Sequence, residues 1–328
     1  MKGFVFGKFY PFHFGHVALV DAAAAQCSRL VILVCASHNE AIPLEIRRTW
    51  IAKHYAARPR ISVLGYAYNE ADLPNTSVSS REVSAVWARV FLHLLPDVGI
   101  LFTSEPYGDF VAAAMGIQHC LFDRERLGVS ISATQIRSNP YRYWDYLPPS
   151  VRPYYVRKVV ILGTESSGKT VLTQQLATYF QTSFVSEVGR DLVAQSYQCN
   201  AELLQQIAQQ HAQAIKAALP HARRYLFIDT DIHITDSYSR FLLGQPLRIA
   251  PWIYEANNAD IYLYLDNDVP YIQDGTRLSE ADCKHLHDSH LAVLHERQIP
   301  IYRISGNWQA RWEQALAIIA SHDEKSNR

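Results

Sequence analysis

The 328-residue sequence predicts an α/β protein with two domains, each built around a parallel sheet. Three observations support this prediction. Short apolar runs rich in Val, Ile and Leu alternate with helical patterns along the whole chain, as expected for sheets covered on both faces. The alternation breaks once, at the prolines of residues 148–156, and then starts again. The length also exceeds what one hydrophobic core usually supports.

In the first half, apolar runs predict strands and periodic segments predict helices. We expect strands at 3–7, 29–37, 60–66 and 99–104. Apolar residues three and four apart predict helices at 17–26, 45–55 and 80–95. Residues 1–147 are therefore assigned to the first domain, and residues 148–156 to a linker.

The second half repeats this organisation. We expect strands at 156–163, 225–231, 260–266 and 297–305, and helices at 169–180, at 202–219 and from about 309. Residues 157–328 are assigned to the second domain.

Composition limits the classes of function. The formal net charge is zero and the isoelectric point is about 7.2, which argues against a nucleic-acid partner. The five cysteines are scattered without a CxxC pair, which favours a reducing compartment. No apolar run approaches the ~20 residues of a membrane span, and Lys8 and His13 interrupt the N-terminal apolar stretch too early for a signal peptide. We expect a cytoplasmic protein.

Residues 163–170, GTESSGKT, fit the P-loop pattern G-x-x-x-x-G-K-[ST] between a predicted strand and a predicted helix. Glycines let the backbone wrap around phosphates, and N–H groups at a helix N-terminus favour anions. Lys169 would reach the β- and γ-phosphates of ATP, and the Thr170 hydroxyl would bind Mg²⁺. The expected ATP-binding residues of this loop are Gly163, Glu165, Ser166, Ser167, Gly168 and Thr170.

Carboxylates near this loop are candidates for metal binding and proton transfer. Asp229 and Asp231 end a predicted strand, where Asp229 could bind the metal. Asp231 could also cap the next helix, and the sequence does not separate these roles. Residues 186–191, SEVGRD, bring Glu187 near Arg190. Either Glu187 or Asp229 could take the proton of an attacking hydroxyl.

Residues 273–287, QDGTRLSEADCKHLH, are predicted to form a mobile lid with a turn at Asp274–Gly275. Arg277 could then swing over the transferring phosphate, where a planar cation would counter its charge. The alternative is an ordinary solvated arginine.

Residues 7–16, GKFYPFHFGH, form a second candidate phosphate-binding loop. Gly7 ends a strand, Gly15 allows a close approach as a helix begins, and His13 and His16 would project into one pocket. Imidazoles there can donate hydrogen bonds to a triphosphate. A zinc site lacks a nearby third ligand, and two buried structural histidines would explain neither the glycines nor Pro11.

Residues 131–138, ISATQIRS, supply a partner motif. Ser132 and Thr134 can hydrogen-bond phosphate oxygens at the start of a helix, and Arg137 adds positive charge. Taken alone, Ser132 would be an ordinary N-cap. Its occurrence with HFGH in one domain favours phosphate binding.

The two halves together resemble bifunctional enzymes of the NadR type, which join nicotinamide-mononucleotide adenylyltransferase to ribosylnicotinamide kinase. GKFYPFHFGH and ISATQIR look like nucleotidyltransferase signatures, and GTESSGKT, SEVGRD, FIDTD and DGTR look like the kinase-half motifs in the same order. The nucleotidyltransferase motifs alone would also fit pantetheine-phosphate or glycerol-phosphate enzymes. The resemblance implies a Rossmann-like nucleotidyltransferase sheet followed by a P-loop kinase sheet.

The resemblance also implies site residues. Those that would bind ATP in the first domain are Gly7, Lys8, Phe9, Tyr10, His13, Gly15, His16, Ser132, Thr134 and Arg137. Trp87 is a candidate to stack on nicotinamide, although it could equally fill the apolar face of its helix. Arg190 and Asp231 are candidates for binding the nicotinamide nucleotide, and Arg47 and Arg48 are further phosphate candidates.

The implied function is synthesis of NAD⁺ in two steps that each consume ATP, with Mg²⁺ as cofactor. Nicotinamide riboside would become nicotinamide mononucleotide, and a second ATP would convert it to NAD⁺ and pyrophosphate. Two alternatives are a single-activity adenylyltransferase with a regulatory P-loop domain and a NAD-responsive regulator. Some relatives carry an N-terminal helix-turn-helix domain, but this sequence begins on the first strand, so repression through that domain is not expected. The oligomeric state is open, although many nucleotidyltransferases form homo-oligomers.

Overall fold

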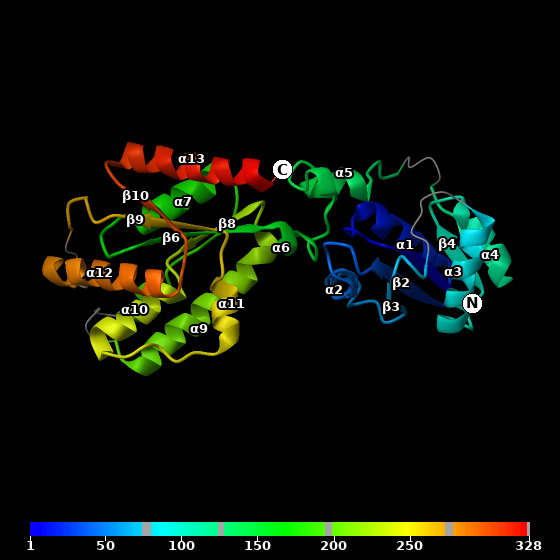
Figure 1. Ribbon diagram of the computed structural model, residues 1–328, viewed down its shortest axis with the longest axis horizontal. Coiled ribbons are helices and arrows are strands. Elements are labelled where there is room, and N and C mark those ends of the chain that lie inside the picture. Colours follow the sequence, from blue (N-terminus) through cyan, green and yellow to red (C-terminus); the bar gives the residue numbers. More distant parts are fainter. Residues whose placement is uncertain (74–79, 124–127, 194–198, 273–277, 327–328) are drawn as a thin grey trace. The chain divides into compact units, whose positions relative to one another are not determined.

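The computed structural model describes residues 1–73, 80–123, 128–193, 199–272 and 278–326. The chain divides into two compact units, Met1–Val151 and Arg152–Arg328, and the division falls inside the segment predicted as a linker (Figure 1). Each unit contains one five-stranded parallel sheet with helices packed against it. The predicted fold class is confirmed.

The first unit has the strand order β3-β2-β1-β4-β5, so β1 lies in the middle of its sheet. The strands are β1 (Lys2–Gly7), β2 (Arg29–Ser37), β3 (Ile61–Tyr68), β4 (Ile100–Thr103) and β5 (Gln118–Leu121). The helices are α1 (Phe14–Gln26), α2 (Leu44–His54), α3 (Arg81–Leu94), α4 (Tyr107–Met115), α5 (Ala133–Ser138) and the 3-10 turn η1 (Trp144–Tyr146).

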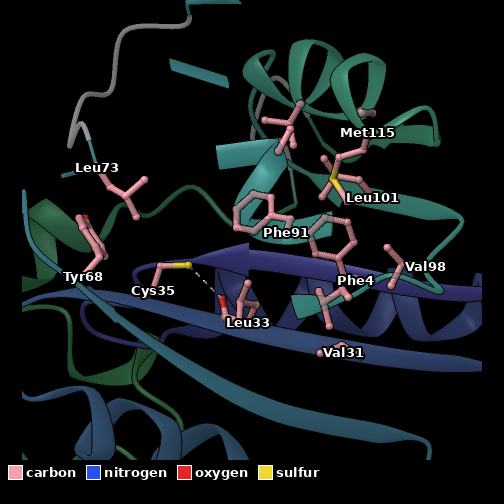
Figure 2. Close-up of a cluster of buried hydrophobic side chains, with 14 residues drawn as sticks. Phe4, Val31, Leu33, Cys35, Tyr68, Leu73, Phe91, Val98, Leu101 and Met115 are labelled. Atoms are coloured by element: carbon pink, nitrogen blue, oxygen red, sulfur yellow. Dashed lines mark hydrogen bonds between the residues drawn. The ribbon is translucent and has the colours of Figure 1, made fainter. Parts of the chain in front are cut away.

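Burial on both faces explains why β1 and β2 are continuous apolar runs. On one face, Phe4 of β1 and Leu101 of β4 pack against Phe91 of α3 and Met115 of α4 (Figure 2). The rings of Phe4 and Phe91 meet edge to face at 5.6 Å between centroids. This core fixes the carboxyl ends of β1 and β4, which border the candidate site.

The second unit has the strand order β10-β9-β6-β8-β7, with β6 in the middle. The strands are β6 (Arg157–Gly163), β7 (Phe184–Val185), β8 (Tyr225–Asp229), β9 (Ile261–Leu265) and β10 (Ile301–Ile304). The helices are α6 (Arg152–Tyr155), α7 (Lys169–Tyr179), α8 (Gly189–Leu192), α9 (Ala201–Ala218), η3 (Leu219–His221), α10 (Ile232–Leu243), α11 (Pro251–Asn257), α12 (Glu280–Glu296) and α13 (Trp308–Ser326).

Two clusters hold the second unit together. Val159 and Leu263 of the sheet pack against Leu176 of α7 and Ile319 of α13. Figure 1 shows these two helices beside the sheet. A second cluster joins α9, α10 and α11 through residues such as Leu204 and Ile232.

Part of the predicted lid is a helix. Of residues 273–287, the first five lie outside the described residues, and α12 begins at Glu280. The Ser279 hydroxyl caps this helix by accepting a hydrogen bond from the Asp282 N–H at 3.1 Å. The polar sequence of the segment suggested a loop, whereas its apolar residues Cys283 and Leu286 are fully buried. Within the described ranges, no helix is long and apolar enough to cross a membrane.

Candidate functional site

Both candidate phosphate-binding loops follow the central strand of their sheet. Residues 7–16 connect β1 to α1, and residues 163–170 connect β6 to α7. In each sheet the chain places two consecutive strands on one side of the central strand and the next two on the other side. Ligands of parallel sheets bind at the carboxyl ends of strands at such a switch point.

His13 and His16 form a reciprocal cap at the start of α1. The His13 Nδ1 atom accepts a hydrogen bond from the Gly15 N–H at 3.1 Å, and the His16 Nδ1 atom accepts one from the His13 N–H at 3.3 Å. The two rings stack with 3.8 Å between centroids. Because an Nδ1 that accepts a backbone N–H carries no proton, a neutral ring here bears its proton on Nε2. The backbone therefore makes each Nε2 a hydrogen-bond donor.

These histidines border a cavity of about 330 Å³. The structure brings together residues that lie far apart in the sequence, since the loop after β1 meets the start of α5. The predicted residues that line the cavity are Gly7, Lys8, Phe9, His13, Gly15, His16, Ser132 and Thr134. The sequence analysis did not predict its other lining residues, which include Thr103, Ser104, Glu105, Tyr107 and Phe122. The first four lie at or just after the end of the predicted strand at 99–104, which was the available signal, whereas Phe122 follows β5, a strand that was not predicted.

Ser132 has the capping role that was weighed as its alternative. Its hydroxyl accepts a hydrogen bond from the Gln135 N–H at 3.2 Å while the residue also lines the cavity. Arg137, one turn later, donates to the Thr134 hydroxyl at 3.0 Å and lies over the Tyr10 ring at 4.7 Å. Tyr10 and Arg137 thus contact each other and are not among the residues that line the cavity.

Arg47 and Arg48 do not line the cavity. Arg47 is fully buried and donates to the Ile42 carbonyl and to the Glu40 carboxylate, the latter at 2.6 Å. Glu40 also pairs with Lys8 at 3.0 Å. Arg48 pairs with Glu45 on the surface. Arg47 therefore organises the loop after β1 from inside the fold.

Trp87 packs into the core of the first unit, which was the alternative to nicotinamide stacking. Its indole contacts Tyr68 edge to face at 5.0 Å and Phe91 at 5.6 Å. It is not among the residues that line the cavity.

The P-loop after β6 is shaped by glycines and by its own hydrogen bonds. Gly163 has φ of +144°, and a Cβ there would lie 2.9 Å from the Leu265 carbonyl oxygen. Lys169 is buried, and its Nζ donates to the Thr164 carbonyl at 2.9 Å. The Ser167 hydroxyl donates to the same carbonyl at 2.7 Å. The Thr164 carbonyl is thereby occupied by side-chain donors of the loop itself.

Thr170 and Asp229 meet at the end of β6. The Thr170 hydroxyl donates a hydrogen bond to Oδ2 of Asp229, whose Oδ1 is buried with no hydrogen-bond partner. Among the described residues, no group of three or more His, Cys, Asp or Glu side chains could hold a metal ion by itself. Mg²⁺ in nucleotide sites takes one or two protein oxygens together with phosphate oxygens and water. The Thr170 hydroxyl and the orphaned carboxylate oxygen of Asp229 fit that ion.

Burial raises the pKa of the Asp229 carboxyl, and the nearby Lys169 ammonium only partly opposes this. Because the folded-state pKa lies above the unfolded value, stability is lost as pH rises through the folded pKa and Asp229 becomes charged. We therefore predict that Asp229→Asn melts at a higher temperature than wild type at pH 7, in buffer without Mg²⁺ or nucleotide. The difference should vanish in acid, where Asp229 is neutral. A less stable variant at pH 7 would contradict this account.

A second cavity, of about 280 Å³, lies beside the P-loop. Glu187 and Arg190 line it and form an ion pair at 3.3 Å. Its other lining residues, missed from the sequence, include Val193, Cys199, Leu204, Thr230, Thr235 and Tyr238. A mixed wall of carboxylate, hydroxyl and apolar groups suits a small polar molecule with a ring.

Glu165 and Ser166, expected to bind ATP, also line this second cavity. Glu165 accepts hydrogen bonds from the Tyr238 hydroxyl at 3.0 Å and from the Leu278 N–H at 2.8 Å. The Ser166 hydroxyl accepts one from the Ile272 N–H at 2.9 Å. Burial, followed by the charge of Glu165, raises the pKa of Tyr238. The side chain of Glu165 is therefore part of the cavity wall.

Asp231 caps α10 by accepting hydrogen bonds from the N–H groups of His233 and Ile234. It is buried and is not among the lining residues of the second cavity, so the structure shows the capping alternative. Arg277 lies outside the described residues.

Comparison with known proteins agrees with both halves of the chain. A family model described as an AAA domain matches residues 158–311. The chain is 31% identical to the trifunctional NAD biosynthesis/regulator protein NadR of Escherichia coli (strain K12), over 92% of this chain and 78% of that protein. Crystal structures of NadR protein with NR, and with NAD and AMP-PNP, align with TM-scores of 0.77 and 0.76 at 20% identity, each covering 98% of this chain and 95% of the other. With two candidate phosphate-binding loops in the expected order and this extent of similarity, the chain belongs to the NadR family.

Proposed function

We propose that this chain makes NAD⁺ from nicotinamide riboside and two molecules of ATP. The proposal rests chiefly on one observation: two phosphate-binding loops follow the central strands of two separate sheets, and each has its own cavity. The relatives support the choice of substrates, because they are described as NAD biosynthesis proteins or as complexes with NR, NAD and AMP-PNP. We assign adenylyl transfer to residues 1–147, phosphoryl transfer to residues 157–328, and a linker to residues 148–156.

In the second unit, the proposed reaction moves the γ-phosphoryl group of ATP to the 5′-hydroxyl of nicotinamide riboside. The backbone of residues 163–170 and the Lys169 ammonium would hold the phosphates. Mg²⁺ bound by Thr170 and Asp229 would supply positive charge next to the transferred group. Because Asp229 already faces Thr170, we assign proton removal to Glu187, which lines the cavity beside Arg190. The products are nicotinamide mononucleotide and ADP.

In the first unit, a phosphate oxygen of the mononucleotide would attack the α-phosphorus of a second ATP, and pyrophosphate would leave. No side-chain nucleophile is required, since positioning and electrostatic stabilisation can supply the rate. The Nε2–H groups of His13 and His16 would donate to the triphosphate oxygens as charge moves onto pyrophosphate. Ser132 and Thr134 would contact phosphates from the start of α5.

The direct test is incubation of the purified protein with nicotinamide riboside, ATP and Mg²⁺, followed by chromatography. We expect NAD⁺ to form with one ADP and one pyrophosphate per molecule, because the two ATP molecules are cleaved at different bonds. A parallel reaction started from nicotinamide mononucleotide should give NAD⁺ and pyrophosphate without ADP. Accumulation of the mononucleotide without any NAD⁺ would exclude the two-step scheme.

A further inference from the structure

Trp308 occupies an unusual position beside the P-loop. It is the first residue of α13, and 52% of its surface is exposed, whereas Trp50 and Trp144 are buried. A Cβ added to Gly168 would lie 2.1 Å from Cη2 and 2.4 Å from Cζ3 of the indole. The six-membered edge of the ring therefore lies directly against the second glycine of the loop. Because Gly168 also has φ of +90°, both its backbone and this contact disfavour any side chain there.

Arg311, one turn further along α13, links this helix to the loop, and its guanidinium carbon lies 5.7 Å from the centre of the Trp308 ring. Its side chain is almost fully buried and donates to the Ser167 carbonyl at 2.7 Å. It also donates to the carbonyls of Gly306 and Asp266, both at 2.9 Å. These bonds tie the P-loop to the ends of β9 and β10. Because Trp308 begins the helix that this network anchors, its backbone position does not depend on a bound nucleotide, which lowers the entropy lost on stacking.

The strand order places Trp308 away from the acceptor side of the site. The residues that line the second cavity come largely from segments that follow β7 and β8, on one side of β6. Trp308 follows β10, on the other side of β6. In phosphoryl transfer the attacking and leaving oxygens lie in line across the transferred group. If the acceptor binds on the β8 side, the nucleoside part of the donor must extend from the P-loop toward β9 and β10.

We propose that the exposed indole of Trp308 is the platform on which the base of the phosphoryl-donor nucleotide stacks. This inference rests on the proposed kinase function of the second unit and adds the recognition of the donor base to it. Stacking uses the flat face of a base and is therefore tolerant of base identity. The indole would contribute affinity for the nucleoside part of the nucleotide, and the P-loop would bind its phosphates.

Trp308→Ala should separate base binding from phosphate binding in the riboside kinase assay. We expect the KM for ATP to rise about tenfold, equivalent to about 1.4 kcal/mol, with little change in kcat. The inhibition constant of tripolyphosphate, which has phosphates but no base, should stay at the wild-type value. Trp308→Phe should keep most of the affinity for ATP. If tripolyphosphate binding weakened as much as ATP binding, Trp308 would only support the loop and the proposal would be wrong.

Photolabelling with 8-azido-ATP tests where the base binds, and the result does not depend on which acceptor the second unit uses. We expect a labelled peptide of the second unit that contains residues 305–312, with labelling suppressed by ATP. Labelling of the second unit only at peptides distant from Trp308 would overturn the inference even if riboside phosphorylation were confirmed. Conversely, a labelled peptide at 305–312 in a protein that fails to phosphorylate the riboside would reject the proposed function and retain the base site. Adenylylation of the mononucleotide by Trp308→Ala serves as the internal control and should match wild type.

Discussion

Lys169→Ala should abolish phosphorylation of nicotinamide riboside while leaving synthesis of NAD⁺ from nicotinamide mononucleotide intact. The lysine is buried at the P-loop, and it is the ammonium that would counter charge on the transferred phosphoryl group. Removing one group that stabilises a transition-state charge typically costs 10²–10³-fold in kcat, so we expect a loss of at least about 10²-fold. The measurement is the rate of ADP formation with the riboside and the rate of pyrophosphate formation with the mononucleotide.

This experiment must distinguish a loss of catalysis from a loss of the folded structure. Lys169 also donates to the Thr164 carbonyl, so its loss could relax the loop. Lys169→Arg keeps a positive charge and a donor but changes its geometry, and it should also be a poor kinase. Circular dichroism melting of both variants checks the fold. A folded Lys169→Ala protein that had lost both reactions would show that the two units do not act as separate sites.

His16→Ala should give the reverse result, with loss of NAD⁺ synthesis from the mononucleotide and normal phosphorylation of the riboside. The Nε2–H of this ring is the donor assigned to the triphosphate in the first unit. We expect a decrease of about 10²-fold or more in the rate of pyrophosphate formation. Initial rates at saturating ATP, measured for both reactions on the same preparation, provide the comparison.

Asparagine at the same position separates the cap of α1 from the phosphate donor. In His16→Asn, the side-chain oxygen can still accept the His13 N–H, as Nδ1 does in the native protein. The Asn side chain is too short to place a donor where the Nε2–H of His16 lies, so the variant should be as inactive as His16→Ala. Its melting temperature should be closer to that of the wild type, because the cap is kept. Full adenylyltransferase activity in His16→Asn would mean that the ring matters only as a helix cap.

The sequence predicted the fold class and most elements because the central strands are long, apolar and buried on both faces. It missed β5, where Gln118 and His119 interrupt a strand of four residues at the edge of the sheet. It also missed α4, α10 and α11. In α12, many polar residues hid the helix, although the Ser279-x-x-Asp282 pattern of a capped N-terminus was present.

The loops were easier to predict than the directions of their side chains. Glycine spacing placed the P-loop on the correct turn, because only glycine tolerates the backbone of Gly163 and Gly168. The motif could not show that Glu165 lines the second cavity, since that depends on Tyr238 and Leu278 from distant segments. The sequence left the role of Trp87 open for a similar reason: an aromatic residue on an amphipathic helix fits a core and a ligand equally well.

The placement of β1 and β6 in the middle of their sheets has a consequence for mutational tolerance. A substitution that shifts either strand would move a candidate phosphate-binding loop and also disturb pairing with neighbours on both sides. The outermost strands β3, β5, β7 and β10 have one neighbour each, so a substitution there disturbs pairing with a single strand. Sequence variation compatible with activity should therefore accumulate from the margins of each sheet inward, with β1 and β6 the slowest segments to diverge.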